Sequence, residues 1–230
     1  MSQIEAVLLD LDGTLVRYER SPGEVLRASF EALGTEPLFP VEEYYARYDE
    51  FAEQCDSMDE LRAECFAALA AERGYEPQRG RDVAEAFGDE RDQTNVELLP
   101  SAERVLDELD RTYRLAVVTN GTPDAQRQKV DAVNLDRWVD TVVVAGHETP
   151  PKPAPEPFER AMRTLDATPA TTVHVGDSLE TDVAGATAAG IDSVWISERE
   201  GHGEVTPTHR IDSVGDLLAP PWATGSSGRR

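Results

Sequence analysis

Lysine and cysteine are nearly missing from this chain of 230 residues, whose only members of these types are Lys129, Lys152, Cys55 and Cys65. Two cysteines are too few for the disulfide framework of a small secreted protein. No apolar run approaches the roughly 18 residues that a membrane-spanning helix needs. Glu5 precedes the first short apolar stretch, where a cleavable leader would carry basic residues. We therefore expect a cytoplasmic protein with no membrane partner.

Basic residues are also scarce relative to acidic ones. The 22 lysines and arginines face 45 aspartates and glutamates, which leaves a net charge of −23. A protein that binds nucleic acid needs clustered cations against the phosphates, so we expect no nucleic-acid partner. Hydrophobic residues make up 40% of the chain, as in an ordinary folded protein. This length suits one large domain, or a domain with a lid.

The shortage of lysine within an acidic chain resembles the composition of proteins from salt-loving cytoplasms. Dense counterions would screen the repulsion among the 45 acidic side chains, which loosens the fold in dilute buffer. We predict a halophilic protein whose melting temperature is higher in about 3 M KCl than in about 0.1 M KCl. Thermal unfolding at the two salt concentrations tests this, and equal melting temperatures would contradict it.

The chain begins with a buried strand and continues into a helical segment. Residues 5–10 form a short apolar run that ends at a carboxylate, followed by Gly13, which predicts a strand that breaks at its carboxyl end. From about 22 to 95 the apolar residues recur at helical spacing and show no alternation. Four helices are expected there, with apolar faces that contain Val25, Leu26, Phe30 and Leu33, then Tyr44, Tyr45, Tyr48 and Phe51, then Leu61, Cys65, Phe66 and Leu69, and last Val83, Ala84, Ala86 and Phe87.

After Pro100, strands and helices alternate. We predict strands at 114–119, 141–145, 171–175 and 191–196, separated by helices near 101–111 and 123–134, from Pro155 onward, and near 180–189. Strands joined through helices of this length form a parallel sheet covered on both faces. The expected fold is therefore α/β, a doubly wound, Rossmann-like parallel sheet with an inserted all-helical segment. We place the core at 1–18 and 97–220, the insert at 19–96, and a fraying tail at 221–230.

Polar residues follow the strands of this predicted sheet, where ligands of such folds bind. Asp10 and Asp12 follow the first strand, and Asp177 and Asp182 follow the strand at 171–175. Lys152 stands between two prolines after the strand at 141–145. Small polar residues follow the strand at 114–119, namely Thr119, Asn120 and Gly121. Carboxylates, a lysine and small donors on one rim suit metal-assisted phosphoryl transfer.

These residues resemble, in order and spacing, the four motifs of the haloacid dehalogenase-like hydrolases. Residues 10–14 are similar to the Asp-x-Asp-Gly-Thr loop, 119–121 to the Thr/Ser loop, Pro151-Lys152-Pro153 to the lysine motif, and 176–182 to Gly-Asp-x-x-x-x-Asp. The resemblance covers roughly 1–20 and 98–218. The helical insert matches the cap of the phosphatase-like branch in position and type, which implies a phosphoric monoester hydrolase.

The resemblance also implies a role for each residue. Asp10 would be the nucleophile that forms an aspartyl-phosphate, and Asp12 would be the general acid and base. Lys152 would offset the charge of the phosphate, which Thr119, Asn120 and Gly121 would bind. Mg²⁺ would be the cofactor, held by the side chains of Asp10 and Asp177 and the main-chain carbonyl of Asp12, with Asp182 acting through a water molecule or orienting the other ligands. We expect His174 to be a core histidine whose hydrogen bonds are satisfied within the protein.

Three other functions remain open at this stage. A haloacid dehalogenase shares the nucleophile but needs neither metal nor acid, so Asp12 and the motif at 176–182 disfavour it. A sugar-phosphate mutase would differ only in the fate of its intermediate. A non-enzymatic phospho-switch would have no helical insert after the first strand. The expected substrate is a small phosphorylated metabolite, with phosphoglycolate, a sugar phosphate and a nucleoside monophosphate all open, and the expected assembly is a monomer or homodimer.

Overall fold

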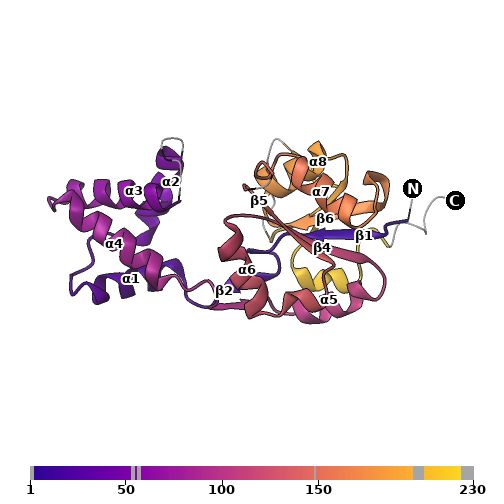
Figure 1. Ribbon diagram of the computed structural model, residues 1–230, viewed down its shortest axis with the longest axis horizontal. Helices are drawn as coiled ribbons and strands as arrows, with labels where there is room; N and C mark the ends of the chain where they lie inside the picture. The colour runs from indigo at the N-terminus through magenta and orange to yellow at the C-terminus, as the bar shows by residue number, and fades with distance from the viewer. Residues whose placement is uncertain (1–2, 53–54, 56–57, 148, 199–204, 224–230) are drawn as a thin grey trace. The chain divides into compact units, whose positions relative to one another are not determined.

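The structure is a computed structural model, and it describes residues 3–52, 55, 58–147, 149–198 and 205–223. The chain divides into two compact units (Figure 1). One unit comprises the described residues of Met1–Arg17 and Val96–Arg230, and the other is Tyr18–Asn95. Most of the tail predicted to fray, 221–230, lies outside the described residues. Within the described ranges, none of the helices has the length and apolar character that crossing a membrane requires.

The first unit is built on a six-stranded sheet whose neighbouring strands are all parallel, which confirms the predicted fold class. In spatial order the strands are β5 (Thr141–Ala145), β4 (Arg114–Asn120), β1 (Ala6–Leu9), β6 (Thr172–Gly176), β7 (Asp192–Ile196) and β8 (His209–Ile211). The prediction misses β8, a short edge strand in which only Ile211 is buried. Leu9 pairs with Val117 of β4 and Val175 of β6, so these three strands end at the same rim.

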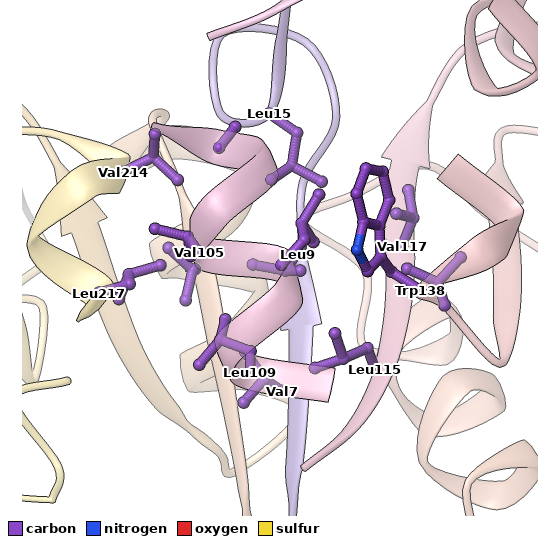
Figure 2. Close-up of a cluster of buried hydrophobic side chains, with 14 of the residues drawn as sticks. Val7, Leu9, Leu15, Val105, Leu109, Leu115, Val117, Trp138, Val214 and Leu217 are labelled. Carbon is purple, nitrogen blue, oxygen red and sulfur yellow. The ribbon is translucent and has the colours of Figure 1, made fainter. Parts of the chain in front are cut away.

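Both faces of the sheet are covered, and β1 shows why its sequence is uniformly apolar. Successive side chains of a strand point to opposite faces. Val7 and Leu9 pack against α5 (Ala102–Asp110) and α6 (Pro123–Ala132), within the cluster that Figure 2 shows. Ala6 and Leu8 pack on the opposite side with residues of α7 (Glu156–Thr164) and α8 (Ala184–Ala188). The first polar residue after the strand is Asp10, at the rim.

The helix predicted near 180–189 is divided. Residues Leu179–Val183 form one wide turn, in which the main-chain N–H of Val183 donates to the carbonyl of Ser178 five residues before it, at 3.1 Å. Only then does α8 begin. Single turns of this π type are frequent at functional sites. Here the turn carries Asp182, which is buried.

The second unit contains the four predicted helices, α1 (Pro22–Ala32), α2 (Val41–Ala52), α3 (Met58–Glu72) and α4 (Pro77–Glu90). Ser21 caps α1 in a reciprocal pair with Glu24, since each side chain bonds to the other residue's main-chain N–H. The core is aromatic, with edge-to-face contacts among Phe30, Phe39, Tyr44, Phe66 and Phe87. Leu33 and Tyr45, which the spacing assigns to apolar faces, are 45% and 49% exposed. The side chain of Tyr48, also assigned to such a face, lies outside the described part of the structure.

A two-stranded sheet of β2 (Val16–Tyr18) and β3 (Val96–Leu98) is a further difference from the prediction. Each strand has only three residues, too few to show a period in the sequence. Arg17 and Glu97 form an exposed ion pair across it.

Candidate active site

Three aspartates meet at the carboxyl ends of β1 and β6. Asp10 follows β1, Asp177 follows β6, and Asp182 lies on the wide turn five residues later. Each offers a carboxylate oxygen, and these oxygens all lie within 4.8 Å of one another. Oxygen ligands at such spacing suit a hard divalent cation. The structure therefore brings together the three side chains that the sequence motifs placed in a metal site.

Lys152 lies beside this group and is almost fully buried. Its Nζ donates to Asp10 Oδ1 at 2.6 Å, to Asp182 Oδ1 at 2.6 Å and to the carbonyl of Val118 at 2.9 Å. Asn120 positions the lysine main chain, because its Oδ1 accepts from the Lys152 N–H at 2.8 Å and its Nδ2 donates to the Lys152 carbonyl at 3.1 Å. Each of the three ammonium protons therefore has an acceptor, and the three acceptors belong to segments at or near the ends of three strands.

The group of charges is unbalanced. Burial opposes the charge of Lys152, but Asp10 and Asp182 outweigh burial and raise the pKa of the lysine. Burial raises the pKa of Asp10, and the negative charge of Asp182 raises it further. Lys152 lowers this pKa, but by less than the other two causes together raise it. Asp177 reaches solvent, yet partial burial and its two neighbouring carboxylates raise its pKa to about 6. Three ionised carboxylates around one ammonium leave two negative charges, which a divalent cation would balance.

Asp182 is held by more than Lys152. Its Oδ1 also accepts from Nε2 of His174 at 3.0 Å, and its Oδ2 accepts from the main-chain N–H of Ser178 at 3.1 Å. Burial alone would raise the pKa of Asp182, but the bonds from His174 and Lys152 lower it. His174 is buried and has a hydrogen-bond partner, as expected of a core histidine. The sequence did not indicate that this partner would be Asp182, so that the ring also orients a carboxylate of the site.

Two glycines allow the carboxylates to approach the main chain. Gly13 has a φ of +81°, and a Cβ there would lie 2.3 Å from Oδ2 of Asp177. A Cβ on Gly176 would lie 2.2 Å from Cγ of Asp182. Any side chain at either position would displace an aspartate of the site. This explains why a glycine follows Asp12 and another precedes Asp177.

The side chain of Asp12 contacts helix α6 and is not among the three carboxylates that meet at the rim. Lys129 of α6 donates to both of its oxygens, at 2.8 Å to Oδ1 and 2.7 Å to Oδ2. Gln126, one helical turn earlier, donates from Nε2 to Asp12 Oδ2 at 3.0 Å. The same Nε2 lies 2.7 Å from Oγ1 of Thr119. The Asp12 carboxylate therefore belongs to a polar cluster on α6 and not to the three-aspartate group.

All three residues predicted to bind phosphate already have protein partners. The amide of Asn120 bonds to Lys152, and the N–H of Gly121 donates to the carbonyl of Ala145 at 3.2 Å. Thr119 is buried at the end of β4, where its Oγ1 accepts the bond from Gln126. These three residues lie at the same rim as Asp10 and Lys152.

Sequence reasoning overlooked Gln126, Lys129 and the role of His174. For Lys129 a signal existed, because the scarcity of lysine that singles out Lys152 applies equally to Lys129. Gln126 and His174 carry no such signal in a single sequence. Their partners lie 114 and 8 positions away along the chain, and only the folded helix and strand bring them together.

Comparisons of the sequence and fold with known proteins identify the family of this chain. The sequence pattern of the haloacid dehalogenase-like hydrolases matches residues 4–190. A phosphoserine phosphatase of Thermus thermophilus is 36% identical over 68% of this chain, which spans 62% of that protein's length. The human N-acylneuraminate-9-phosphatase is 31% identical over 86% of this chain and 84% of its own. The magnesium-bound crystal structure of the hydrolase YfnB from Bacillus subtilis shares the fold, with a TM-score of 0.76, 23% identity, and coverage of 94% of this chain and 98% of its own. The chain belongs to the haloacid dehalogenase-like hydrolases, in their phosphatase branch.

Proposed function

We propose that this protein hydrolyses a small phosphorylated metabolite through an aspartyl-phosphate, with Mg²⁺ as its cofactor. The observation that carries the proposal is the convergence of Asp10, Asp177 and Asp182 on one another and on Lys152. A carboxylate nucleophile beside a buried ammonium and two further carboxylates, of which Asp177 would ligate the metal ion, suits attack on a phosphate dianion.

In the first step, an oxygen of Asp10 attacks phosphorus and the bond to the leaving-group oxygen breaks. Asp12 gives its proton to that oxygen. In the second step, Asp12 takes a proton from water, and the water oxygen attacks the phosphorus of the aspartyl-phosphate. Inorganic phosphate leaves and Asp10 is regenerated. The ammonium of Lys152, whose Nζ lies 2.6 Å from Oδ1 of Asp10, stabilises the negative charge on the reacting groups. Of the three residues predicted to bind the phosphoryl oxygens, Thr119 would do so through its hydroxyl at the end of β4. The amide of Asn120 already bonds to Lys152 and the N–H of Gly121 to the Ala145 carbonyl, so these two residues would shape the loop around the phosphate.

The side chains of Asp10 and Asp177, with the main-chain carbonyl of Asp12, would hold the magnesium ion. The two negative charges left over in the three-aspartate group match the charge of such an ion, and oxygen ligands match its preference. Bound there, Mg²⁺ would neutralise charge on the phosphate and so favour its approach to Asp10. Asp182 keeps Lys152 and the turn in place, since both of its oxygens already accept protein hydrogen bonds.

A phosphate-release screen over about a hundred phosphorylated metabolites, in high salt, tests the proposal. Phosphoserine and N-acylneuraminate 9-phosphate belong in it because two relatives are named for them. We expect turnover of at least one metabolite and of para-nitrophenyl phosphate with Mg²⁺, and a fall of about 10²-fold or more when EDTA is added. Readdition of Mg²⁺ is the control and should restore the rate.

Each remaining alternative predicts a different product. Fluoride released from a 2-fluoro acid without any metal would favour a haloacid dehalogenase. A phosphorylated isomer in place of inorganic phosphate would favour a mutase. A stable aspartyl-phosphate that does not turn over would favour a phospho-switch. Any of these results, with no phosphate released, would overturn the proposal.

A further inference from the structure

We propose that Gln126 and Lys129 are positioning residues for Asp12, so that helix α6 sets the geometry of the acid and base. This inference rests on the proposed function, in which Asp12 moves the two protons. It concerns residues outside the four sequence motifs, and it assigns a task to the helix that follows the second of them.

Lys129 is placed for one carboxylate. Its side chain is only 7% exposed, although its partner Asp12 is 39% exposed. The ammonium contacts both oxygens of Asp12, at 2.8 and 2.7 Å, which fixes the plane of the carboxylate as well as its position. An ammonium with a buried stem has few ways to turn, so the contact restricts Asp12 more than an exposed ion pair would.

Gln126 connects Asp12 to the end of β4. It is 2% exposed, and three acceptors lie within hydrogen-bond distance of its Nε2, with Thr119 Oγ1 and the Asn120 carbonyl at 2.7 Å each and Asp12 Oδ2 at 3.0 Å. The two N–H groups of the amide are shared among these three acceptors. One amide therefore links the proposed acid and base to the proposed phosphate-binding loop. Its Oε1 is buried with no partner among the described residues, a cost that a residue serving packing alone would not carry.

Helix geometry explains how the two residues act together. They stand three positions apart on α6 and so share one face, while Val130 of the same helix packs into the core of the sheet unit. Pro123 at the first turn fixes where this helix begins, two residues after Gly121. The strand end, the helix and Asp12 thus form one connected scaffold, which holds the proton donor at a set distance from the bound phosphate.

The test uses leaving groups of different quality. Transfer of phosphorus from 2,4-dinitrophenyl phosphate needs no proton donor, whereas transfer from phenyl phosphate does. We expect Lys129→Met and Gln126→Leu to lower kcat/KM for phenyl phosphate by about 10²-fold, and for the dinitrophenyl ester by less than about 3-fold. Asp12→Asn should also lower kcat/KM for phenyl phosphate more than for the dinitrophenyl ester, and by the largest factor of the variants. Lys129→Arg should recover part of the loss seen in Lys129→Met. Arg127→Met is the matched control, because Arg127 is an exposed cation of α6 whose partners are Asp131 and Asp136.

A double-mutant cycle separates positioning from other effects. If Lys129 acts through Asp12, Lys129→Met should change phenyl phosphate turnover by less than about 3-fold in the Asp12→Asn background. Equal losses on both esters, an unchanged or higher rate in Lys129→Met, or additive losses in the cycle would each overturn the inference. The proposed function fails separately, if the parent protein releases phosphate from neither ester. Thermal unfolding of each variant shows whether a lost rate reflects a lost fold, and Lys129→Arg then replaces Lys129→Met in the cycle.

Discussion

The Asp10→Asn variant is expected to lose phosphate release by about 10⁴-fold or more while keeping its fold. The amide has nearly the shape of the carboxylate but cannot attack phosphorus. Because burial already raises the pKa of Asp10, a neutral group is tolerated at this position better than at an exposed one. Lys152 also keeps its second carboxylate partner, Asp182, at 2.6 Å.

The measurement is the rate of phosphate release from para-nitrophenyl phosphate, together with circular dichroism and the melting temperature. A covalent phosphoenzyme, trapped by acid quench with labelled substrate, should form in the parent and not in the variant. Asp110→Asn, an isosteric change at the exposed end of α5, is the matched control and should leave both readouts unchanged. A rate in Asp10→Asn within tenfold of the parent, about 1.4 kcal/mol in barrier height, would assign the nucleophile to another residue.

The second large effect concerns stability. Lys152→Met is expected to lower the free energy of unfolding of the metal-free protein by about 3–5 kcal/mol, because Asp10 and Asp182 would remain buried without their cation. Both side chains are less than a tenth exposed, so water cannot replace the ammonium. Urea unfolding in EDTA, followed by tryptophan fluorescence, measures this loss. All three tryptophans lie in the sheet unit, so the signal reports that unit.

The chain contains one matched control for this experiment, its other lysine. Lys129→Met removes the same charge from the same length of side chain, but Asp12 is 39% exposed and can be hydrated. We expect a loss of about 1 kcal/mol there. The double variant Lys152→Met/Asp182→Asn should be more stable than Lys152→Met alone, since it retains one fewer buried charge. Equal losses at the two lysines would contradict the view that the buried group depends on Lys152.

The parts of the fold that the sequence predicts are those with a long or strong pattern. The strands β1, β4 and β6 are largely buried on both faces, and β5 and β7 are short runs with a buried apolar centre. The four helices of the second unit bury residues at helical spacing. The strands β2, β3 and β8 have three residues each and are missed because so short a segment has no readable period. Leu33 and Tyr45 fit an apolar face by spacing, but they are exposed because hydrophobic residues are not confined to the core.

The candidate site divides in the same way. The residues that follow strands could be placed together from topology alone, since the ends of parallel strands share a rim. The contacts of Asp12 could not, because they depend on how α6 lies against the loop after β1, more than a hundred positions away in the chain. The separation of Asp12 from the three-aspartate group likewise follows from side-chain directions that a motif does not encode.

The wide turn at Leu179–Val183 makes the number of residues in that stretch part of the chemistry. Asp182 lies on this turn and contacts Lys152, His174 and the Ser178 N–H from it. Deleting a single position between Asp177 and Asp182 would rotate every later side chain by about 100° around the helix axis. Homologous chains can therefore differ in composition along this stretch far more freely than they can differ in its length.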